Sequence, residues 1–381
     1  MTSEIRVLDT LLRDRAVTRP QIAATTQLSK PAVSEAIRRL EQMRIVRAIG
    51  TRRGDRGRSA VAYELSSDIG AVVGMDLGGM NIRVRIANPH GDPLAEATEA
   101  TRRLGAPEVA EQAIALMFRT LADHALEGLP LLALGISTPG VVDPVTHRVT
   151  LGYNIDANGT FDLLPLIADR FPGMAAVDNN VNCAARAEQR RGHARDVPTF
   201  AFVSVGAGIG MGVVYEGTLL RGRRGAAGEI AYMPLAVDPF SPEHRRRGAL
   251  EDDASAAGML DAAARRIGWP SGPPQTVEQL FALAASGVLA AQEVIDREAK
   301  LLAMAISGVC TVIDPDLVVL GGGIGANPHL LPAVTKGVDL LLPVPPRIMT
   351  TALGAQASVV GATELALDLA HDELRRRASP S

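Results

Sequence analysis

Glycine turns beside apolar, strand-like segments are the first candidates for chemistry in this sequence. They stand at Gly78-Gly79, with Asp76 just before them, at Gly206-Ala207-Gly208 and at Gly321-Gly322-Gly323. A glycine turn lets the backbone approach a ligand closely, and its exposed N–H groups suit phosphate. One such turn is weak evidence, whereas three in this order are more specific.

Basic and polar side chains also gather on one predicted helix near the N-terminus. Ser29-Lys30-Pro31 starts this helix, and Val33, Ile37 and Leu40 form its apolar face. A short helix, capped by the segment 18–21, precedes it after a turn of a few residues. This is the helix-turn-helix arrangement. The residues on or beside the polar face, which we expect to contact DNA, are Lys30, Ser34, Glu35, Arg38 and Arg39.

The segments 45–49 and 61–65 alternate like strands and enclose an arginine- and glycine-rich tip. The tip resembles the wing of a winged helix, and its Arg53, Arg56 and Arg58 suit phosphates or a minor groove. The alternative is a helical protein-interaction module with solvated charges. The helix pair, the hairpin and the local positive charge agree, so the sequence favours DNA binding.

The segment 70–365 as a whole resembles the repressor, open reading frame and kinase (ROK) family. The matching segments are 74–86, 135–140, 178–188, 206–212, 228–229, 248–251 and 321–323. The resemblance implies an α/β body with the two-lobed actin-like, ribonuclease H-like fold of sugar kinases. The winged helix before it resembles the head of the family's sugar-responsive repressors, which its kinases lack.

The resemblance places the family's Asn-Asp pair at Asn179-Asn180. In the sugar kinases the Asn contacts sugar hydroxyls and the Asp is the general base. An amide cannot accept that proton at neutral pH, and loss of a positioned base costs on the order of 10²–10⁴ in rate. Asn180 can still form hydrogen bonds, so binding can survive without catalysis. Helix capping is the alternative role of both asparagines.

The nucleotide side of the site departs from the family as well. Met80 stands where the kinases usually have Thr, and Ala207 stands where their second glycine turn has Thr. Phosphoryl transfer depends on positioned charge and hydrogen bonds. We therefore expect no catalytic residue and no cofactor, and we favour the glycine turns as tight connections over a working ATP site.

The family's structural zinc site is also altered. Its His position is Tyr232, and its three Cys positions are Pro242, His244 and Ala249. One possible ligand does not make a tetrahedral site, so we expect no zinc. The adjacent run 245–247 is most simply a solvated arginine loop, and an anionic effector or partner is the alternative.

Two family glutamates that hydrogen-bond sugar hydroxyls are retained at Glu229 and Glu251. Satisfying buried backbone groups is the alternative role for these carboxylates. The expected ligand contacts are Gly79, Asn179, Asn180, Glu229, Tyr232 and Glu251.

Charge divides the chain in the same place as the motifs do. Residues 1–66 hold 13 Lys and Arg against 7 Asp and Glu, a net charge of +6, whereas the rest has −9 and the 381-residue chain has −3. We predict a winged helix-turn-helix domain at 1–66, a first lobe at 70–184 joined by a C-terminal helix at about 355–376, and a second lobe at 185–354. The two cysteines, Cys183 and Cys310, lie far apart in the sequence and favour a reducing cytoplasmic setting. The sequence has no long uncharged apolar run, so we expect no membrane span.

The sequence therefore predicts a cytoplasmic transcription regulator that acts as a repressor. Its partners would be operator DNA and a sugar or sugar derivative, and it would form a homodimer or homotetramer on a palindromic site. A ligand between the lobes would change the spacing of the two winged-helix heads in the oligomer. That change would alter the affinity for the operator. The alternatives are an active sugar kinase with a DNA-binding head and a regulator whose body serves only for oligomerisation.

Overall fold

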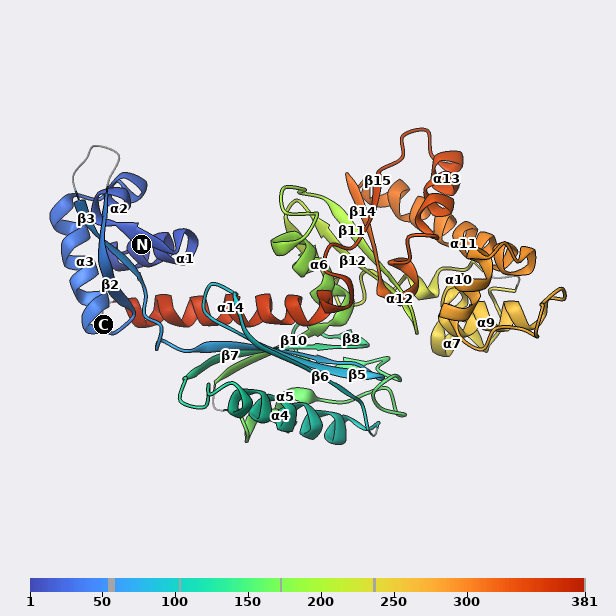
Figure 1. The fold of residues 1–381 in the computed structure, drawn as a ribbon, viewed down its shortest axis with the longest axis horizontal. Coiled ribbons are helices and arrows are strands. Elements are labelled where there is room, and N and C mark those ends of the chain that lie inside the picture. Colours follow the sequence, from blue (N-terminus) through green and yellow to red (C-terminus); the bar gives the residue numbers. More distant parts are fainter. Residues whose placement is uncertain (54–58, 103, 172, 236–237, 380–381) are drawn as a thin grey trace. The chain divides into compact units, whose positions relative to one another are not determined.

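The computed structural model describes residues 1–53, 59–102, 104–171, 173–235 and 238–379. The chain divides into two compact units (Figure 1). The first comprises Met1–Ser137, Asp162–Val177 and Ala362–Ser381, and the second comprises Thr138–Phe161 and Asp178–Gly361.

The N-terminal part of the first unit is a winged helix, here called the head. Its elements are α1 (Ser3–Asp14), β1 (Ala16–Thr18), α2 (Arg19–Thr26), α3 (Lys30–Gln42), β2 (Val46–Arg53) and β3 (Ser59–Leu65). The strands are ordered β1-β3-β2, with β3 antiparallel to both neighbours. The predicted capping box is confirmed, because the Thr18 N–H donates to Gln21 Oε1 at 2.9 Å.

A larger sheet forms the rest of the first unit, in the order β10-β7-β4-β5-β6. Its strands are β4 (Ala71–Leu77), β5 (Asn81–Ala87), β6 (Pro93–Ala100), β7 (Leu131–Thr138) and β10 (Met174–Asn179). Strands β4, β5 and β6 form an antiparallel meander, and β4 pairs in parallel with β7. Every residue of β4 is buried, as expected for a central strand covered on both faces.

Helices cover both faces of this sheet. α4 (Ala106–Asp123) and α5 (Leu163–Ala168) lie on one face, and the long α14 (Ala357–Ala378) runs along the other (Figure 1). Ala366, Leu367 and Ala370 of α14 pack against Val72 and Leu132 of the sheet. Gly135 of β7 makes this close approach possible, because a Cβ there would lie 1.9 Å from the carbonyl oxygen of residue 362.

The head contacts the β5–β6 turn of the same unit. Arg15, which follows α1, donates two hydrogen bonds of 2.6 Å to the carboxylate of Asp92 in that turn. The ring of His90 lies with Nδ1 3.2 Å from the Leu12 carbonyl oxygen. These contacts hold α1 beside the turn.

The end of α14 contributes to the core of the head. Leu374 is fully buried and Ala378 is 1% exposed, and both pack in the cluster that contains Leu8, Leu11 and Ile37. Asp9 of α1 accepts a 2.8 Å hydrogen bond from Arg375 Nε. The first and last helices of the chain are therefore joined by an apolar core and an ion pair.

The second unit contains a sheet in the order β13-β12-β11-β14-β15. Its strands are β11 (Phe200–Val205), β12 (Ile209–Tyr215), β13 (Thr218–Leu220), β14 (Leu317–Gly321) and β15 (Arg347–Thr350). β11, β12 and β13 form an antiparallel meander, and β11 pairs in parallel with β14. Each unit thus has a meander whose first strand pairs in parallel with a strand from later in the chain.

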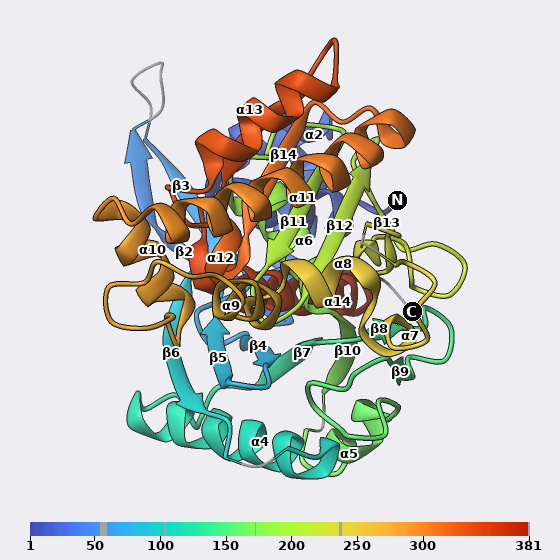
Figure 2. The same cartoon turned by 90° about the vertical axis from the view of Figure 1, so that its right-hand side faces the viewer.

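Helices flank the second sheet on both faces. α6 (Asn180–Arg191) packs against β11 and β12, whereas α11 (Leu289–Ile313) and α13 (Leu331–Leu341) lie side by side in the other layer (Figure 2). The remaining elements are β8 (Val141–Val142), β9 (Val149–Thr150), η1 (Ile230–Tyr232), α7 (His244–Arg247), α8 (Ala249–Ala254), α9 (Ala256–Ala264), α10 (Val277–Ala285), α12 (Gly322–Gly325) and η2 (Gly354–Gln356).

Within the described ranges, no helix is both long and apolar enough to cross a membrane. Both cysteines are free thiols with buried side chains.

Candidate functional site

Asn179 begins helix α6 as its N-cap. Its Oδ1 accepts hydrogen bonds from the N–H groups of Val181 and Asn182 at 2.8 and 3.2 Å, and its Nδ2 donates to the Gly140 carbonyl at 2.8 Å. These bonds satisfy two of the free N–H groups of the first helical turn and fix the amide. The capping role considered from the sequence is therefore present at Asn179, and its role as a ligand contact stays a prediction.

Asn180 is the first residue of α6, and its half-buried side chain carries a neutral amide. Its carbonyl oxygen accepts a 3.1 Å hydrogen bond from Ser358 Oγ, which fixes the backbone at this position. An amide here can orient a hydroxyl group but cannot remove its proton. Its contact with a ligand also stays a prediction.

Asp178, just before these asparagines, forms an ion pair that the sequence did not indicate. Its buried carboxylate accepts hydrogen bonds from Arg221 Nη2 at 2.6 Å, from the Asn179 N–H at 2.9 Å and from Asn182 Nδ2 at 3.2 Å. The pair fastens the loop at Arg221 beside the start of α6. No local pattern could have revealed it, because the partners lie far apart in the chain.

Glu251 lies on α8 and supports the second glycine turn. Its Oε2 accepts a 2.9 Å hydrogen bond from the Ile209 N–H, and its Oε1 lies 3.4 Å from Arg247 Nε. A Cβ at Gly208 would lie 2.7 Å from Oε2, so glycine is needed for this close approach. Glu251 thus satisfies a backbone group, the alternative role considered from the sequence, while its carboxylate remains partly exposed.

The structure brings Glu229, Tyr232 and Glu251 together. Burial raises the pKa of Glu229 to about 7, and the nearby Glu251 carboxylate adds to the rise. Burial raises the pKa of the Tyr232 hydroxyl, and both glutamates contribute to that rise. Burial also raises the pKa of Glu251, against the lowering effect of the Ile209 N–H and Arg247. Carboxyl groups so close together can accept hydrogen bonds from neighbouring hydroxyls of a polyol.

The loop after Tyr232 is held by side-chain contacts. The Tyr232 hydroxyl donates a 3.2 Å hydrogen bond to the Arg246 carbonyl, and the Arg246 guanidinium lies 4.8 Å from the centre of the Tyr153 ring. His244 Nδ1 lies 2.7 Å from Asp252 Oδ2, and this hydrogen bond raises the His244 pKa. Among the residues that the structure describes, no group of three or more His, Cys, Asp and Glu is arranged to hold a metal ion.

Gly79, the remaining predicted ligand contact, lies in the first unit, in the turn between β4 and β5. Thr101 Oγ1 donates a 2.6 Å hydrogen bond to the Gly78 carbonyl in this turn. Nearby, the buried Asp76 accepts hydrogen bonds from Ser137 Oγ at 2.7 Å and Arg83 Nη1 at 3.2 Å. Burial nevertheless raises the pKa of Asp76.

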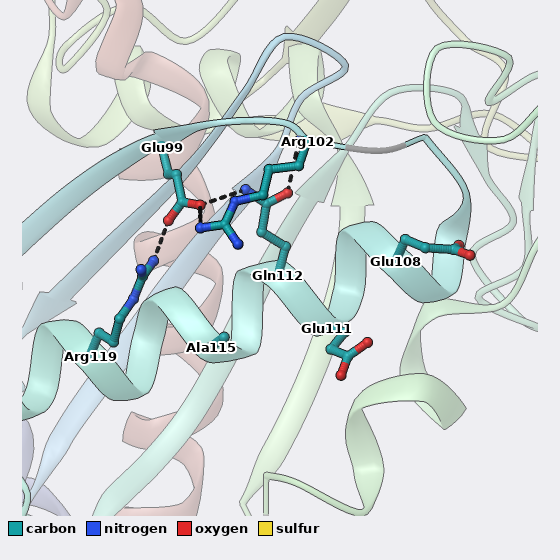
Figure 3. Close-up of a pocket in the computed structure, with 7 residues that line it drawn as sticks. All are labelled: Glu99, Arg102, Glu108, Glu111, Gln112, Ala115 and Arg119. Carbon is teal, nitrogen blue, oxygen red and sulfur yellow. Dashed lines mark hydrogen bonds and ion pairs between the residues drawn. The ribbon is translucent and has the colours of Figure 1, made fainter.

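A hollow of about 500 Å³ lies between β6 and α4 of the first unit, and none of the predicted ligand contacts is among its lining residues (Figure 3). It is lined by Glu99, Arg102, Glu108, Glu111, Gln112, Ala115 and Arg119. Glu99 pairs with Arg102 and Arg119 and accepts a 2.9 Å hydrogen bond from Gln112 Nε2. Because its central carboxylate is engaged by neighbouring donors, we assign no ligand to this hollow.

The predicted DNA-binding helix is α3. Ser29 caps it by accepting a 3.3 Å hydrogen bond from the Ala32 N–H, and its buried face carries Val33, Ala36, Ile37 and Leu40. Lys30, Glu35, Arg38 and Arg39 are exposed, and Ser34 is half-buried. Backbone in the left-handed region at Gln27 makes the tight turn from α2. Of the predicted wing arginines, Arg53 belongs to β2, and Arg56 and Arg58 lie outside the described residues.

Ion pairs separate the basic residues of α3 into different roles. Glu35 pairs with Arg38 at 2.6 Å and with Arg39 at 3.0 Å, and these hydrogen bonds lower the Glu35 pKa to about 2. Arg39 also pairs with the buried Glu4 of α1 at 2.9 Å. Arg39 therefore joins two helices of the head, and Arg38 pairs with Glu35 of its own helix through two hydrogen bonds. Lys30 is the more available phosphate contact on this helix.

Comparisons with known proteins match the N-terminal winged helix and the rest of the chain to separate families. The ROK family model matches residues 72–369, and a winged helix-turn-helix DNA-binding model matches residues 2–47. A xylose repressor of Caldicellulosiruptor bescii is 24% identical over 333 residues, which cover 84% of this chain and 82% of the repressor. A glucokinase of Halalkalibacterium halodurans is 25% identical over 318 residues, 76% of this chain and 92% of the kinase.

The crystal structure of a ROK family transcriptional regulator, described as a homolog of the E. coli MLC protein, has a TM-score of 0.79. It is 22% identical, and the match covers 98% of this chain and 97% of that one. The predicted architecture, a winged helix followed by a sugar-kinase-like body, is thereby confirmed.

Proposed function

The chain belongs to the ROK family, and from that premise we propose that it is a transcriptional repressor whose kinase-like body senses a sugar or sugar derivative without phosphorylating it. The observation that carries the proposal is the N-terminal winged helix joined to this body. Its α3 buries an apolar face and exposes Lys30 and Arg38. The match to a xylose repressor, which covers 84% of this chain, supports the same combination.

The sensing role is supported by the carboxylates of Glu229 and Glu251, which lie beside Tyr232. Carboxylates accept hydrogen bonds from sugar hydroxyls, as the family resemblance implies for these positions. Asn179 and Asn180 at the start of α6 are further proposed contacts, as is Gly79 in the first unit. The effector would act by favouring one of two conformations that differ in operator affinity.

The absence of catalysis rests on the amide of Asn180 where the family's kinases have a carboxylate. A coupled ADP-release assay with glucose, xylose and ATP tests it, with a ROK glucokinase as the positive control. We expect no ADP release above the rate without sugar. Sugar-dependent turnover would identify the protein as a kinase with a DNA-binding head.

The proposal includes a homodimer or homotetramer in the cytoplasm that reads a palindromic operator. Two-fold symmetric helix-turn-helix proteins place two recognition helices about one helical turn of DNA apart. Light scattering after gel filtration tests the assembly, and a monomer at micromolar concentration would contradict it.

A gel-shift titration tests the proposal as a whole. The full-length protein is mixed with the DNA upstream of its own gene, and neutral sugars, sugar acids and sugar phosphates are added in turn. We expect specific binding that one class of sugar changes at least tenfold. Binding no tighter than to a scrambled duplex would contradict the DNA-binding role, and binding that no sugar alters would contradict sensing.

A further inference from the structure

Two tyrosines and an arginine lie together next to the Glu229–Glu251 pair of the second unit. We call Tyr153, Tyr232 and Arg246 the aromatic cluster. Its members come from the β9–α5 connection, from η1 and from α7. The Tyr232 hydroxyl donates to the Arg246 carbonyl, and the Arg246 guanidinium lies over the Tyr153 ring. The hydrogen bond from Tyr232 therefore holds in place the backbone that carries the Arg246 guanidinium.

Arg246 differs from the other arginines near this site. Arg247 pairs with Glu251, and Arg221 pairs with Asp178. For Arg246, the interaction with the Tyr153 ring is the side-chain contact that the structure shows, and the residue is exposed. A guanidinium stacked on an aromatic ring keeps its in-plane N–H groups for a carboxylate or phosphate.

The cluster and the glutamates give this site two ends of different character. Glu229 and Glu251 offer oxygen acceptors to hydroxyl groups, and Arg246 offers paired donors to an anion. A ligand that extends from one end to the other would carry hydroxyls at one end and a negative charge at the other. A cationic substituent, as in an amino sugar, would meet the positive charge of Arg246 instead.

We propose that the aromatic cluster is a subsite for the anionic group of a hydroxylated effector, either the carboxylate of a sugar acid or the phosphate of a sugar phosphate. This proposal rests on the proposed sensing function and specifies an anionic, hydroxylated molecule as the effector. The rings of Tyr153 and Tyr232 provide an apolar surface beside the sugar, and Arg246 binds the anion. The raised pKa of Glu229, about 7, leaves part of that carboxyl neutral at physiological pH and so limits its repulsion of an anion.

Isothermal titration calorimetry on the full-length protein tests the subsite. The ligands are matched sets: glucose with gluconate, glucuronate and glucose 6-phosphate, and xylose with xylonate. The variants are Arg246→Gln, Arg246→Lys and, as the matched control, the exposed neighbour Arg245→Gln. Circular dichroism melting confirms that each variant is folded.

We expect at least one anionic ligand to bind tenfold or more tightly than its neutral counterpart. Arg246→Gln should abolish that preference, Arg246→Lys should restore part of it, and Arg245→Gln should keep it. The comparison of carboxylate with phosphate ligands identifies which anion the subsite takes.

Different failures separate the subsite from the sensing function. Neutral sugars that bind as tightly as every anionic counterpart would overturn the subsite and leave sensing intact. An equal loss in Arg246→Gln and Arg245→Gln would also overturn it, because the effect would then be general electrostatic attraction. If no ligand of either class binds, sensing itself fails, and the subsite fails with it.

Discussion

The Asn179 side chain illustrates how one residue can carry both a structural and a binding role. Its oxygen caps α6 and its nitrogen holds the Gly140 carbonyl, so the amide plane is fixed before any ligand arrives. The sequence pointed to this residue through the family resemblance. The sequence also offered helix capping as its alternative role, and the structure adds the bond from its nitrogen to the Gly140 carbonyl.

Replacing this cap should weaken the start of α6. Asn179→Ala removes the acceptor for two backbone N–H groups, and loss of an N-cap costs about 1–2 kcal/mol. Hydrogen exchange of the first α6 amides should accelerate accordingly. Asn179→Asp, which keeps the acceptor, serves as the control and should retain most of the protection. Equal exchange in all three proteins would contradict the capping role.

The raised pKa of Glu229 predicts a pH-dependent stability. Below pH about 4.5 the carboxyl is protonated in both the folded and the unfolded chain. Between 4.5 and about 7 the unfolded chain loses this proton while the folded one keeps it, so stability falls as pH rises through that window. The span corresponds to about 3 kcal/mol at most, since each unit of pKa is worth about 1.4 kcal/mol.

Thermal melts of Glu229→Gln across pH 5–8 check this prediction. The variant should lose part of the decline in melting temperature that the wild type shows up to pH 7. The exposed Glu243→Gln is the control and should follow the wild type. Parallel curves for Glu229→Gln and the wild type would show that the Glu229 carboxyl titrates normally.

At the scale of elements, helix α14 contributes residues to three hydrophobic clusters. Its first residue, Ala357, packs in a cluster of the second unit, its middle packs on the first-unit sheet, and Leu374 and Ala378 pack in the head. The family resemblance implied a C-terminal helix at about 355–376, and the observed helix is Ala357–Ala378. The resemblance joined this helix to the first lobe and gave no contact with the head, so its packing in the head was not foreseen.

Truncating Leu374, near the C-terminus, should therefore destabilise the N-terminal head, because its side chain packs in the core of the head. Removing a fully buried leucine side chain costs about 2–5 kcal/mol. Leu374→Ala should accelerate hydrogen exchange in α1 and α3 and weaken operator binding. Leu341→Ala, at a half-exposed leucine of α13, is the control and should change neither. Unchanged exchange in the head would contradict the shared core.

The same contrast between local and distant information explains what the sequence could predict. The capping box at Thr18, the proline-started helices and the glycine turns are local signals, and the structure contains these elements. The Asp178–Arg221 pair and the Arg246–Tyr153 contact join distant positions. Such contacts can be recognised only in the folded chain, because no local pattern marks them. For this reason the sequence analysis interpreted the arginine run 245–247 as a solvated loop.

At the scale of the molecule, the uneven charge predicts how DNA binding responds to salt. The head has a net charge of +6 and the rest has −9. DNA association through phosphate contacts releases counterions, so operator affinity should fall steeply between 50 and 200 mM salt. Lys30→Ala should reduce the slope of log affinity against log salt by about 1, equally on specific and scrambled DNA.

Arg39→Ala provides the comparison for this measurement. Because Arg39 pairs with Glu4 of α1, its loss should lower the melting temperature and change the salt slope less than Lys30→Ala does. Fluorescence anisotropy at four salt concentrations gives both slopes. A larger slope change for Arg39→Ala than for Lys30→Ala would reverse the roles assigned to the two residues.

The shared core of head and C-terminal helix limits how such proteins can be recombined. A chimera made by exchanging residues 1–66 alone would leave behind the Asp92 partner of Arg15 and the Leu374 that fills the head. The transplanted segment would then expose an apolar face and lose two ion pairs. Heads of this kind would have to be exchanged, in the laboratory or in evolution, together with the β5–β6 turn and the last turns of α14.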